Sequence, residues 1–350
     1  MSKTISGALR FSSIIQIIFV DGKEDNVTIR AYLYDADGRD EEIEIDAVDI
    51  SKLDENKLLW IDVLKRDADL VRTVADKLKL KNVPIASMVS EPTRPVIENF
   101  DSFFRFSIHS IEKPDSGRAP KRLPVDYIVG PDLVITVHDG EVEEFAEFHK
   151  REKGETQLGG LDAESFVATL VDFHIVSYFR VLDEIEKRVD KLDANVLKRE
   201  LETQDFLAEM VQLRSDVSKL RRWLMPHRDV IYSFLRADFQ KITEADSIEQ
   251  FKILSEHFEN AVDAVESSRE MVISVFDLYA TKSAQLMNIF IQRLTFLTLI
   301  TGTLSVVAGI LGMNYKVSFF ESSYGFWITI TGMLLIAFAL TIFARFRRWI

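Results

Sequence analysis

The chain has 350 residues, of which 47% are hydrophobic, an ordinary globular composition with room for two or three domains. Its 56 acidic and 43 basic residues give a formal net charge of -13, which argues against a general nucleic-acid binder because such a protein needs a basic face to neutralise phosphates. The chain has no cysteine, which excludes disulfides, thiolate metal sites and a cysteine nucleophile.

Residues 1–160 are predicted to form a cytoplasmic α/β domain. No signal peptide is expected, because the apolar run Phe11–Val20 is short, contains polar residues and lacks a small-residue cleavage site. Asp67–Leu80 has apolar residues at helical spacing and is predicted to be a helix. Short β-like runs separated by turns are predicted as strands, namely Ile14–Val20, Val27–Tyr34, Leu58–Val63, Phe103–His109, Val125–Val129 and Leu133–His138.

Residues 161–245 are predicted to form a subdomain of long antiparallel helices. From Glu164 onward charges are interleaved with apolar residues at helical spacing, and only Pro226 interrupts the pattern. The apolar residues expected to pack against neighbouring helices are Phe173, Val176, Phe179 and Val181–Ile185.

Residues 246–312 are predicted to form a stalk helix that continues into the membrane. After a loop near Thr243–Ser247, helical periodicity runs from Ile248 to Gly312 without a proline. At 1.5 Å per residue such a helix is about 98 Å long. This length exceeds a single globular domain, so a stalk that enters the membrane as one piece is expected.

Two transmembrane helices are predicted. Leu294–Leu311 and Gly325–Phe343 contain no charged residue, and each reaches the roughly 18 to 20 residues that a bilayer core requires. The second span is assigned to residues 325–344, and residues 313–324 are predicted to be an extracytoplasmic loop.

The basic tail, residues 345–350, gives the orientation. The loop between the spans carries only Lys316 and Glu321, so the positive-inside rule places the C-terminus in the cytoplasm, and two crossings place the N-terminus there too. We expect a multi-pass protein of the cell (inner) membrane. In an oligomer the tail would form a basic ring of Arg345, Arg347 and Arg348.

One face of the first predicted span is small and polar. Steps of four and three residues place on it Ala284, Asn288, Ile291, Thr295, Thr298, Gly302, Ser305, Gly309 and Gly312. Small residues allow close packing of helices in lipid. Alternatively, several copies turn this face to a shared axis, where hydroxyls and carbonyls line a wet path for ions. The second interpretation requires a homo-oligomer, because a single helix cannot form a pore.

Gly312-Met313-Asn314 follows the first span at its outer end and favours the pore. By itself the tripeptide would be a helix C-cap, since glycine tolerates the left-handed conformation. At a helix C-terminus, however, unpaired carbonyls and the helix dipole attract cations. Neutral oxygens suit Mg²⁺, which gives up its inner water shell reluctantly and is held through its waters. A ring of Asn314 carboxamides could hold such a hydrated ion.

These residues resemble the CorA family of magnesium transporters, whose hallmark is Gly-Met-Asn at the outer end of the first of two C-terminal spans. The resemblance covers the whole chain. The residues that carry it are Ala308 to Asn314, Tyr279, Met287-Asn288, Pro226 with Arg228, Arg94-Pro95, and Arg345 to Arg348.

The resemblance implies a homopentamer, with a funnel of α/β cytoplasmic domains (an α/β/α sandwich), a long helical stalk and two C-terminal transmembrane helices. We expect influx of Mg²⁺ down its electrochemical gradient, with no cofactor and no enzymatic activity, and the alternatives of passive and coupled transport stay open. By the same resemblance Gly312, Met313 and Asn314 form the selectivity filter, and Asn288 is a polar ring deeper in the pore. Ile291 and Leu294 would then be a hydrophobic gate.

The chain departs from the family pattern at three places. Thr303 stands where the family usually has proline, and the outer loop 315–324 offers only Glu321 as an acid. Ser87 and Ile253 stand where better-known members have an acidic pair that binds magnesium and closes the pore, and neither can be a carboxylate ligand. Other acids that could serve closure are Glu256, Glu259 and Asp263.

Two alternatives stay open. The same fold could carry Zn²⁺, Co²⁺ or Ni²⁺, although none of the histidines has the close spacing that a zinc site prefers. Alternatively, the spans merely anchor a scaffold or enzyme, although the α/β region has no Walker, Gly-x-Ser-x-Gly, His-Glu-x-x-His or Rossmann pattern. The histidines are His109, His138, His149, His174, His227 and His257.

Overall fold

The structure, a computed structural model, describes residues 28–36, 40–50, 53, 56–112, 119–140, 142–151, 162–198, 203–236, 239, 241–242, 245–313 and 323–346. The chain divides into two compact units, the first comprising residues 1–191 and 203–272 and the second residues 192–202 and 273–350. The predicted strand Ile14–Val20 lies outside the described residues.

The first unit is built on a seven-stranded mixed sheet with the strand order β2-β1-β3-β7-β6-β5-β4. Strands β3 and β7 pair in parallel, and the other neighbours are antiparallel. The strands are β1 (Ile29–Asp35), β2 (Glu41–Ile43), β3 (Lys57–Val63), β4 (Ile97–Asn99), β5 (Phe104–Glu112), β6 (Lys121–Gly130) and β7 (Leu133–Val137). The central strands are almost continuously buried, which requires cover on both faces.

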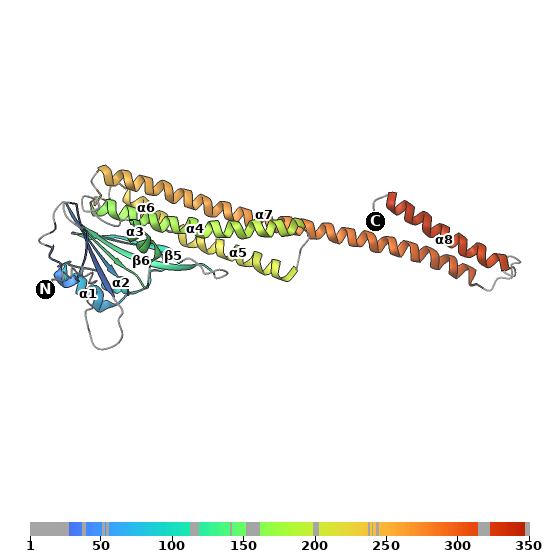
Figure 1. Ribbon diagram of the computed structural model, residues 1–350, viewed down its shortest axis with the longest axis horizontal. Helices are drawn as coiled ribbons and strands as arrows, with labels where there is room; N and C mark the ends of the chain where they lie inside the picture. The colour runs from blue at the N-terminus through green and yellow to red at the C-terminus, as the bar shows by residue number, and fades with distance from the viewer. Residues whose placement is uncertain are drawn as a thin grey trace, which may run out of the picture. The chain divides into compact units, whose positions relative to one another are not determined.

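Helices cover both faces of the sheet (Figure 1). One layer consists of η1 (Ile45–Ala47), α1 (Ala68–Lys77) and α2 (Ile85–Val89), and the other includes α3 (Glu143–Arg151), α4 (Ala163–Lys198) and α6 (His227–Phe234). Alternate residues of β3 reach the two layers: Ile61 packs with Val71 of α1, whereas the Trp60 ring lies 5.0 Å from Phe145 of α3 and 5.5 Å from Phe166 of α4. The predicted α/β/α sandwich is confirmed.

Two long helices complete the first unit. Helix α5 (Thr203–Leu224) is separated from α6 by Met225 and Pro226, where the predicted break occurs. Helix α7 (Ala245–Leu311) belongs to the first unit up to Val272. Polar contacts hold this part of α7: the His257 ring lies 2.7 Å from Asp172 of α4, and Glu259 lies 2.7 Å from Arg228 of α6.

Helix α7 begins earlier than the pattern predicts. The expected start was Ile248 after a loop reaching Ser247, whereas the helix begins at Ala245. Asp162 explains the difference, because its carboxylate accepts hydrogen bonds from the Ser165 amide in the first turn of α4 and from the Ser247 hydroxyl. Ser247 is therefore held inside the first turn of α7 by a partner that lies far away in the sequence.

Part of the predicted packing of α4 is wrong. Val176 and Phe179 are 40% and 36% exposed, whereas Val181, Leu182 and Ile185 are buried as expected. The buried face of α4 includes polar residues such as His174, which hydrophobic spacing does not register. Strands β2 and β4 and helix α2 were not predicted, because elements of three to five residues are too short to show a period.

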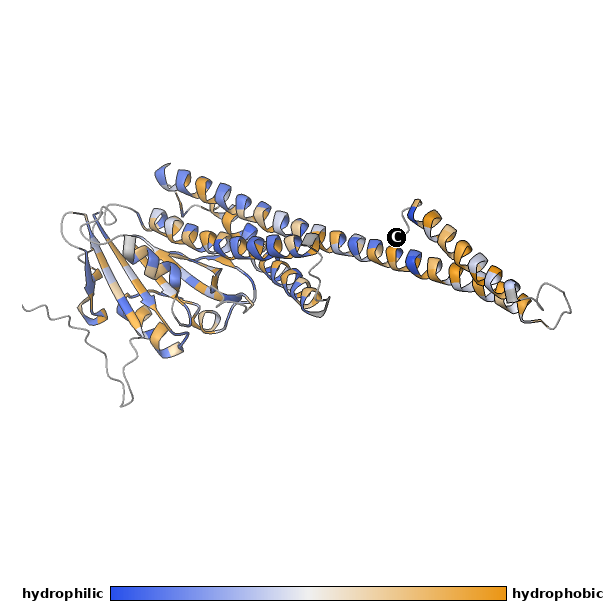
Figure 2. Cartoon of the chain, turned by 45° about the vertical axis from the view of Figure 1, so that its right-hand side comes forward, coloured by the Kyte–Doolittle hydropathy of each residue, from blue (hydrophilic) through white to orange (hydrophobic). Residues whose placement is uncertain are grey.

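The second unit contains the rest of α7 and helix α8 (Ser323–Phe346). Among the described residues, three helices are long and apolar enough to cross a membrane, namely α4, α7 and α8. In α4, 67% of the most apolar stretch is buried inside the protein, whereas none of the corresponding stretch of α7 or α8 is buried. In Figure 2 α8 and the C-terminal part of α7 are coloured mostly as hydrophobic.

Candidate ion pathway

The polar face predicted for the first span is uncovered in the structure. Its residues from Ala284 to Gly312 are all exposed, and those up to Gly309 lie on the uninterrupted helix α7. The less exposed residues of the same stretch form another face, which consists of Phe296, Ile300, Thr303, Leu304, Val307 and Leu311. At 100° per residue, this second face lies opposite the polar one.

Helix α8 accounts for the half-buried face of α7. It runs beside the C-terminal part of α7 in both views of the chain (Figures 1 and 2). Its own less exposed residues recur at helical spacing and are mostly small: Gly325, Thr329, Gly332, Met333, Ala337, Leu340 and Ala344. We infer that α8 packs on the face of α7 that lies opposite the polar residues, so the polar face stays free for other partners.

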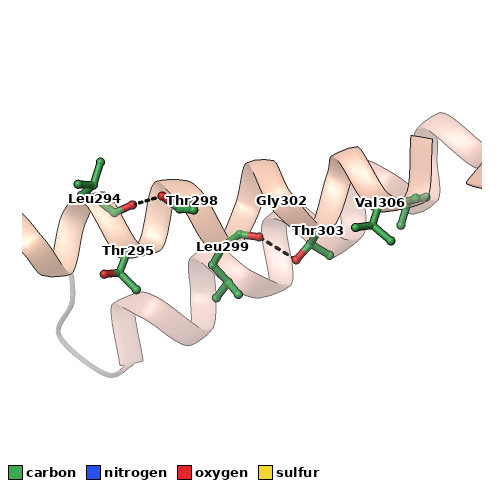
Figure 3. Close-up of a pocket in the computed structure, with 8 residues that line it drawn as sticks. Leu294, Thr295, Thr298, Leu299, Gly302, Thr303 and Val306 are labelled. Carbon is green, nitrogen blue, oxygen red and sulfur yellow. Dashed lines mark hydrogen bonds between the residues drawn. The ribbon is translucent and has the colours of Figure 1, made fainter. Parts of the chain in front are cut away.

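A groove of about 770 Å³ runs along α7 and overlaps the polar face (Figure 3). Thr295, Thr298 and Gly302 of the polar face line it together with Thr303 and apolar residues on its flank. The flanking residues are Leu294, Leu299, Thr303, Val306 and Val307. In a single chain this groove is open, so the polar face forms one wall of a path and not a closed channel.

The threonine hydroxyls of α7 are bonded to their own helix. The Thr295 hydroxyl donates to the Ile291 carbonyl at 2.8 Å, and the Thr298 hydroxyl donates to the Leu294 carbonyl at 2.9 Å (Figure 3 shows the second). Each hydroxyl has one proton, so this bond commits its only donor and leaves the oxygen lone pairs as acceptors. The exposed hydroxyl oxygens of Thr295 and Thr298 can therefore accept hydrogen bonds but not donate them.

Two glycines on the polar face have no packing reason within the chain. A Cβ atom added at Gly302 or Gly309 would meet no atom within 4 Å. At Gly312 a Cβ would lie 3.3 Å from the Ala308 carbonyl oxygen, so this glycine allows a close backbone approach. Gly302 and Gly309 therefore leave room beside α7 that a neighbouring helix could approach closely.

The outer end of α7 is only partly described. The Gly312 amide donates to Ala308 at 2.9 Å and the Met313 amide to Ile310 at 3.2 Å, which closes the last turn. Among the described glycines only Gly140 has a positive φ, so the left-handed C-cap expected at Gly312 does not occur. Asn314, Arg347 and Arg348 lie outside the described residues, and Arg345 is exposed in the last turn of α8.

The other residues predicted to line or close a pore are exposed in the single chain. Asn288, Ile291 and Leu294 are exposed on α7, with Ile291 at 50% and Leu294 at 53%. The sequence reasoning missed Asp277, which is exposed seven residues before Ala284 and so continues the polar face toward the first unit. Extending the four-and-three spacing backward from Ala284 would have found it.

The acids considered for closure do not form a metal site in the described part of the chain, where no group of three or more His, Cys, Asp or Glu could hold a metal. Glu259 is already bound to Arg228 and accepts a hydrogen bond from the Tyr232 hydroxyl at 3.0 Å. Glu256 and Asp263 are exposed. Ile253 is 46% exposed on α7, and Ser87 is exposed in α2.

The buried histidines bind other groups of the protein. The Tyr127 hydroxyl lies 2.6 Å from Nε2 of His174, and the His109 amide donates to Nε2 of His227 at 2.8 Å. Nε2 of His138 lies 2.8 Å from Asp62. The first two contacts join the sheet to its covering helices, and the third joins neighbouring strands, so all three have a structural role.

Comparisons with known proteins agree with this architecture. A family model described as CorA-like Mg²⁺ transporter protein matches residues 55–348. The cobalt/magnesium transport protein CorA of Thermotoga maritima is 22% identical over 295 residues, which cover 83% of each chain. That of Methanocaldococcus jannaschii is 23% identical over 309 residues, which cover 87% of this chain and 95% of the other.

Among solved structures, the complete CorA magnesium transporter from Methanocaldococcus jannaschii matches with a TM-score of 0.76 at 18% identity. The match covers 93% of this chain and 100% of that one, so the fold is shared from the sheet to the C-terminal helices. The chain therefore belongs to the family of CorA-like Mg²⁺ transporter proteins.

Proposed function

We propose that the chain forms a homopentameric channel that conducts hydrated divalent cations, Mg²⁺ first, into the cytoplasm. The observation that carries the proposal is the exposed polar face of α7, which lies opposite the face covered by α8. A stretch of helix that is otherwise apolar has no reason to keep this face free unless other copies complete it. The pentamer rests on the family resemblance.

The proposed path runs from the Gly312-Met313-Asn314 filter to Asp277. Asn314 receives the ion with its water shell, because Mg²⁺ dehydrates reluctantly and carboxamide oxygens can bind its waters. Ile291 and Leu294 form the apolar constriction, and Asn288 is the polar ring beyond it. The membrane potential drives entry, with about 4.6 kcal/mol for a divalent ion at 100 mV.

The proposed topology has two spans in the inner membrane, with both termini in the cytoplasm. Helix α4 is not counted as a span, because most of its apolar stretch is buried inside the first unit. Tyr324 and Trp327 are exposed at the start of α8, as expected for aromatic residues at the outer interface. Arg345, with Arg347 and Arg348 beyond it, would mark the cytoplasmic end.

Co²⁺ is the second candidate ion, because the two related transport proteins are named for cobalt and magnesium. Zn²⁺ and Ni²⁺ have no supporting observation in the described residues. A pure membrane anchor is disfavoured by the exposed Gly302 and Gly309, which no contact within the chain requires.

The test is uptake of Mg²⁺ and Co²⁺ into liposomes that hold the purified protein. Wild type should take up Mg²⁺, and Asn314→Ala should lose most of this flux. Gly302→Leu should block the path, whereas Ala339→Leu on the exposed side of α8 is the control, because it adds bulk away from the path. Absent flux in wild type, or equal flux in all variants, would sink the proposal.

A further inference from the structure

The hydroxyls of Thr295 and Thr298 differ from those of free threonines in what they can offer to a passing ion. Both side chains are exposed on the polar face, and both donate their proton to a carbonyl one turn earlier, at 2.8 and 2.9 Å. An unconstrained hydroxyl can turn to donate or to accept. These two hydroxyls present only oxygen lone pairs, because their protons are already used.

Hydrated ions distinguish acceptors from donors. Water molecules around a cation turn their oxygens inward and their hydrogens outward, so the hydrated cation is a hydrogen-bond donor. Water molecules around an anion offer the opposite pattern and need donors from the wall. A wall that only accepts therefore favours a hydrated cation and disfavours an anion without any charged residue.

The position of the two threonines fits this role. Thr295 and Thr298 are about 4.5 Å apart along the helix axis, and they follow directly after Leu294 of the apolar constriction. In a ring of copies, two layers of acceptors would hold the water shell on the outer side of that constriction. We propose that Thr295 and Thr298 form acceptor-only oxygen rings that select hydrated cations over anions.

This inference rests on the proposed channel function and deepens it. The chain provides a matched control in Thr341 of α8, whose hydroxyl donates to the Ala337 carbonyl at 2.8 Å. Thr341 is exposed and does not line the groove on α7. Removal of its hydroxyl makes the same chemical change on a helix of the second unit, away from the polar face.

The experiment compares Mg²⁺ uptake and the Mg²⁺-to-Cl⁻ permeability ratio, from reversal potentials, in bilayers that hold the full chain. The double variant Thr295→Val/Thr298→Val keeps side-chain size and removes the oxygens, and we expect about tenfold less Mg²⁺ flux and a lower permeability ratio. Thr295→Ser/Thr298→Ser keeps hydroxyls and should stay close to wild type, as should Thr341→Val.

Equal loss in Thr341→Val and in the valine pair would overturn the inference, because the effect would then come from the loss of any helical hydroxyl and not from the polar face. An unchanged permeability ratio in the valine pair would also overturn it. If the valine pair fails to assemble, the single Thr298→Val variant carries the same comparison. If wild type shows no Mg²⁺ flux, the proposed channel function is wrong. This outcome differs from one in which wild type conducts Mg²⁺ but the threonine variants show no change.

Discussion

The residues that join the sheet to its second helical layer include several buried histidines. Burial lowers the pKa of His109 to about 3, with a smaller contribution from His227 nearby. Burial also lowers the pKa of His174 to about 3 and that of His227 to about 4. A charged imidazolium would have to leave water at these positions, so the folded protein keeps the rings neutral.

These shifts predict that acid destabilises the first unit. Unfolded histidine titrates near pH 6.5, so between about pH 6.5 and 4 the unfolded chain binds more protons than the folded one. The contribution of these three histidines to the free energy of unfolding should therefore be fully present above pH 6.5. As the pH drops below 6.5, the free energy of unfolding should fall by about 1.4 kcal/mol per pH unit for each of the three.

Melting temperatures of the full chain at pH 7.5 and 5.0 test this effect. His174→Gln should reduce the difference between the two temperatures, because one buried imidazole is gone. His257→Gln is the control, since that ring is 47% exposed. The same pH dependence in His174→Gln and wild type would contradict the assignment.

At the scale of elements, one carboxylate joins the starts of two helices. Asp162 accepts from the Ser165 amide of α4 and from the Ser247 hydroxyl of α7, and Ser165 donates to Ser247 at 3.2 Å. Both contacts lie at helix N-termini, where a negative charge also interacts favourably with the helix dipoles. Asp67 has part of the same role as Asp162. Its carboxylate caps α1 by accepting hydrogen bonds from the Asp69 and Leu70 amides.

Removal of these two carboxylates should lower the free energy of unfolding by different amounts. Asp67→Ala deletes a helix cap and should lower the free energy of unfolding by about 1 kcal/mol. Asp162→Ala also deletes the link to α7 and should cost about 2 kcal/mol. Thermal denaturation of the full chain gives the comparison. A smaller effect at Asp162 than at Asp67 would show that the link between α4 and α7 does not stabilise the fold.

At the scale of the whole molecule, buried and exposed apolar surface are divided between the two units. The first unit buries its apolar residues in an α/β/α sandwich, whereas the apolar stretches of α7 and α8 in the second unit are exposed. An exposed apolar surface of this length is stable only in contact with lipid or with other copies. The distribution supports the proposed topology.

Single cysteines can test the topology, because the natural chain has none. Ser318→Cys places a thiol in the segment between α7 and α8, and Ser218→Cys places one on the exposed side of α5. A membrane-impermeant maleimide added to intact cells should label the first variant and not the second. After lysis both should react. Labelling of Ser218→Cys in intact cells would reverse the proposed orientation.

Much of the fold was predictable from local patterns. Buried strands such as Leu58–Val63, the proline-free helix that ends near Gly312 and the apolar helix after it are visible because each depends on the spacing of apolar residues. The edge strands β2 and β4 were not predictable, since their formation depends on pairing with neighbours and not on their own three residues.

The candidate site likewise combines features that the sequence predicted with features that only the folded structure determined. Spacing along the sequence determined which residues share the polar face of α7, because a regular helix repeats every 3.6 residues. Only the tertiary structure left the opposite face of α7 less exposed than the polar one, committed the hydroxyl protons of Thr295 and Thr298, and bound Glu259 to Arg228. Helical periodicity is a local property, whereas packing, hydrogen-bond partners and burial depend on segments that meet only after the chain has folded.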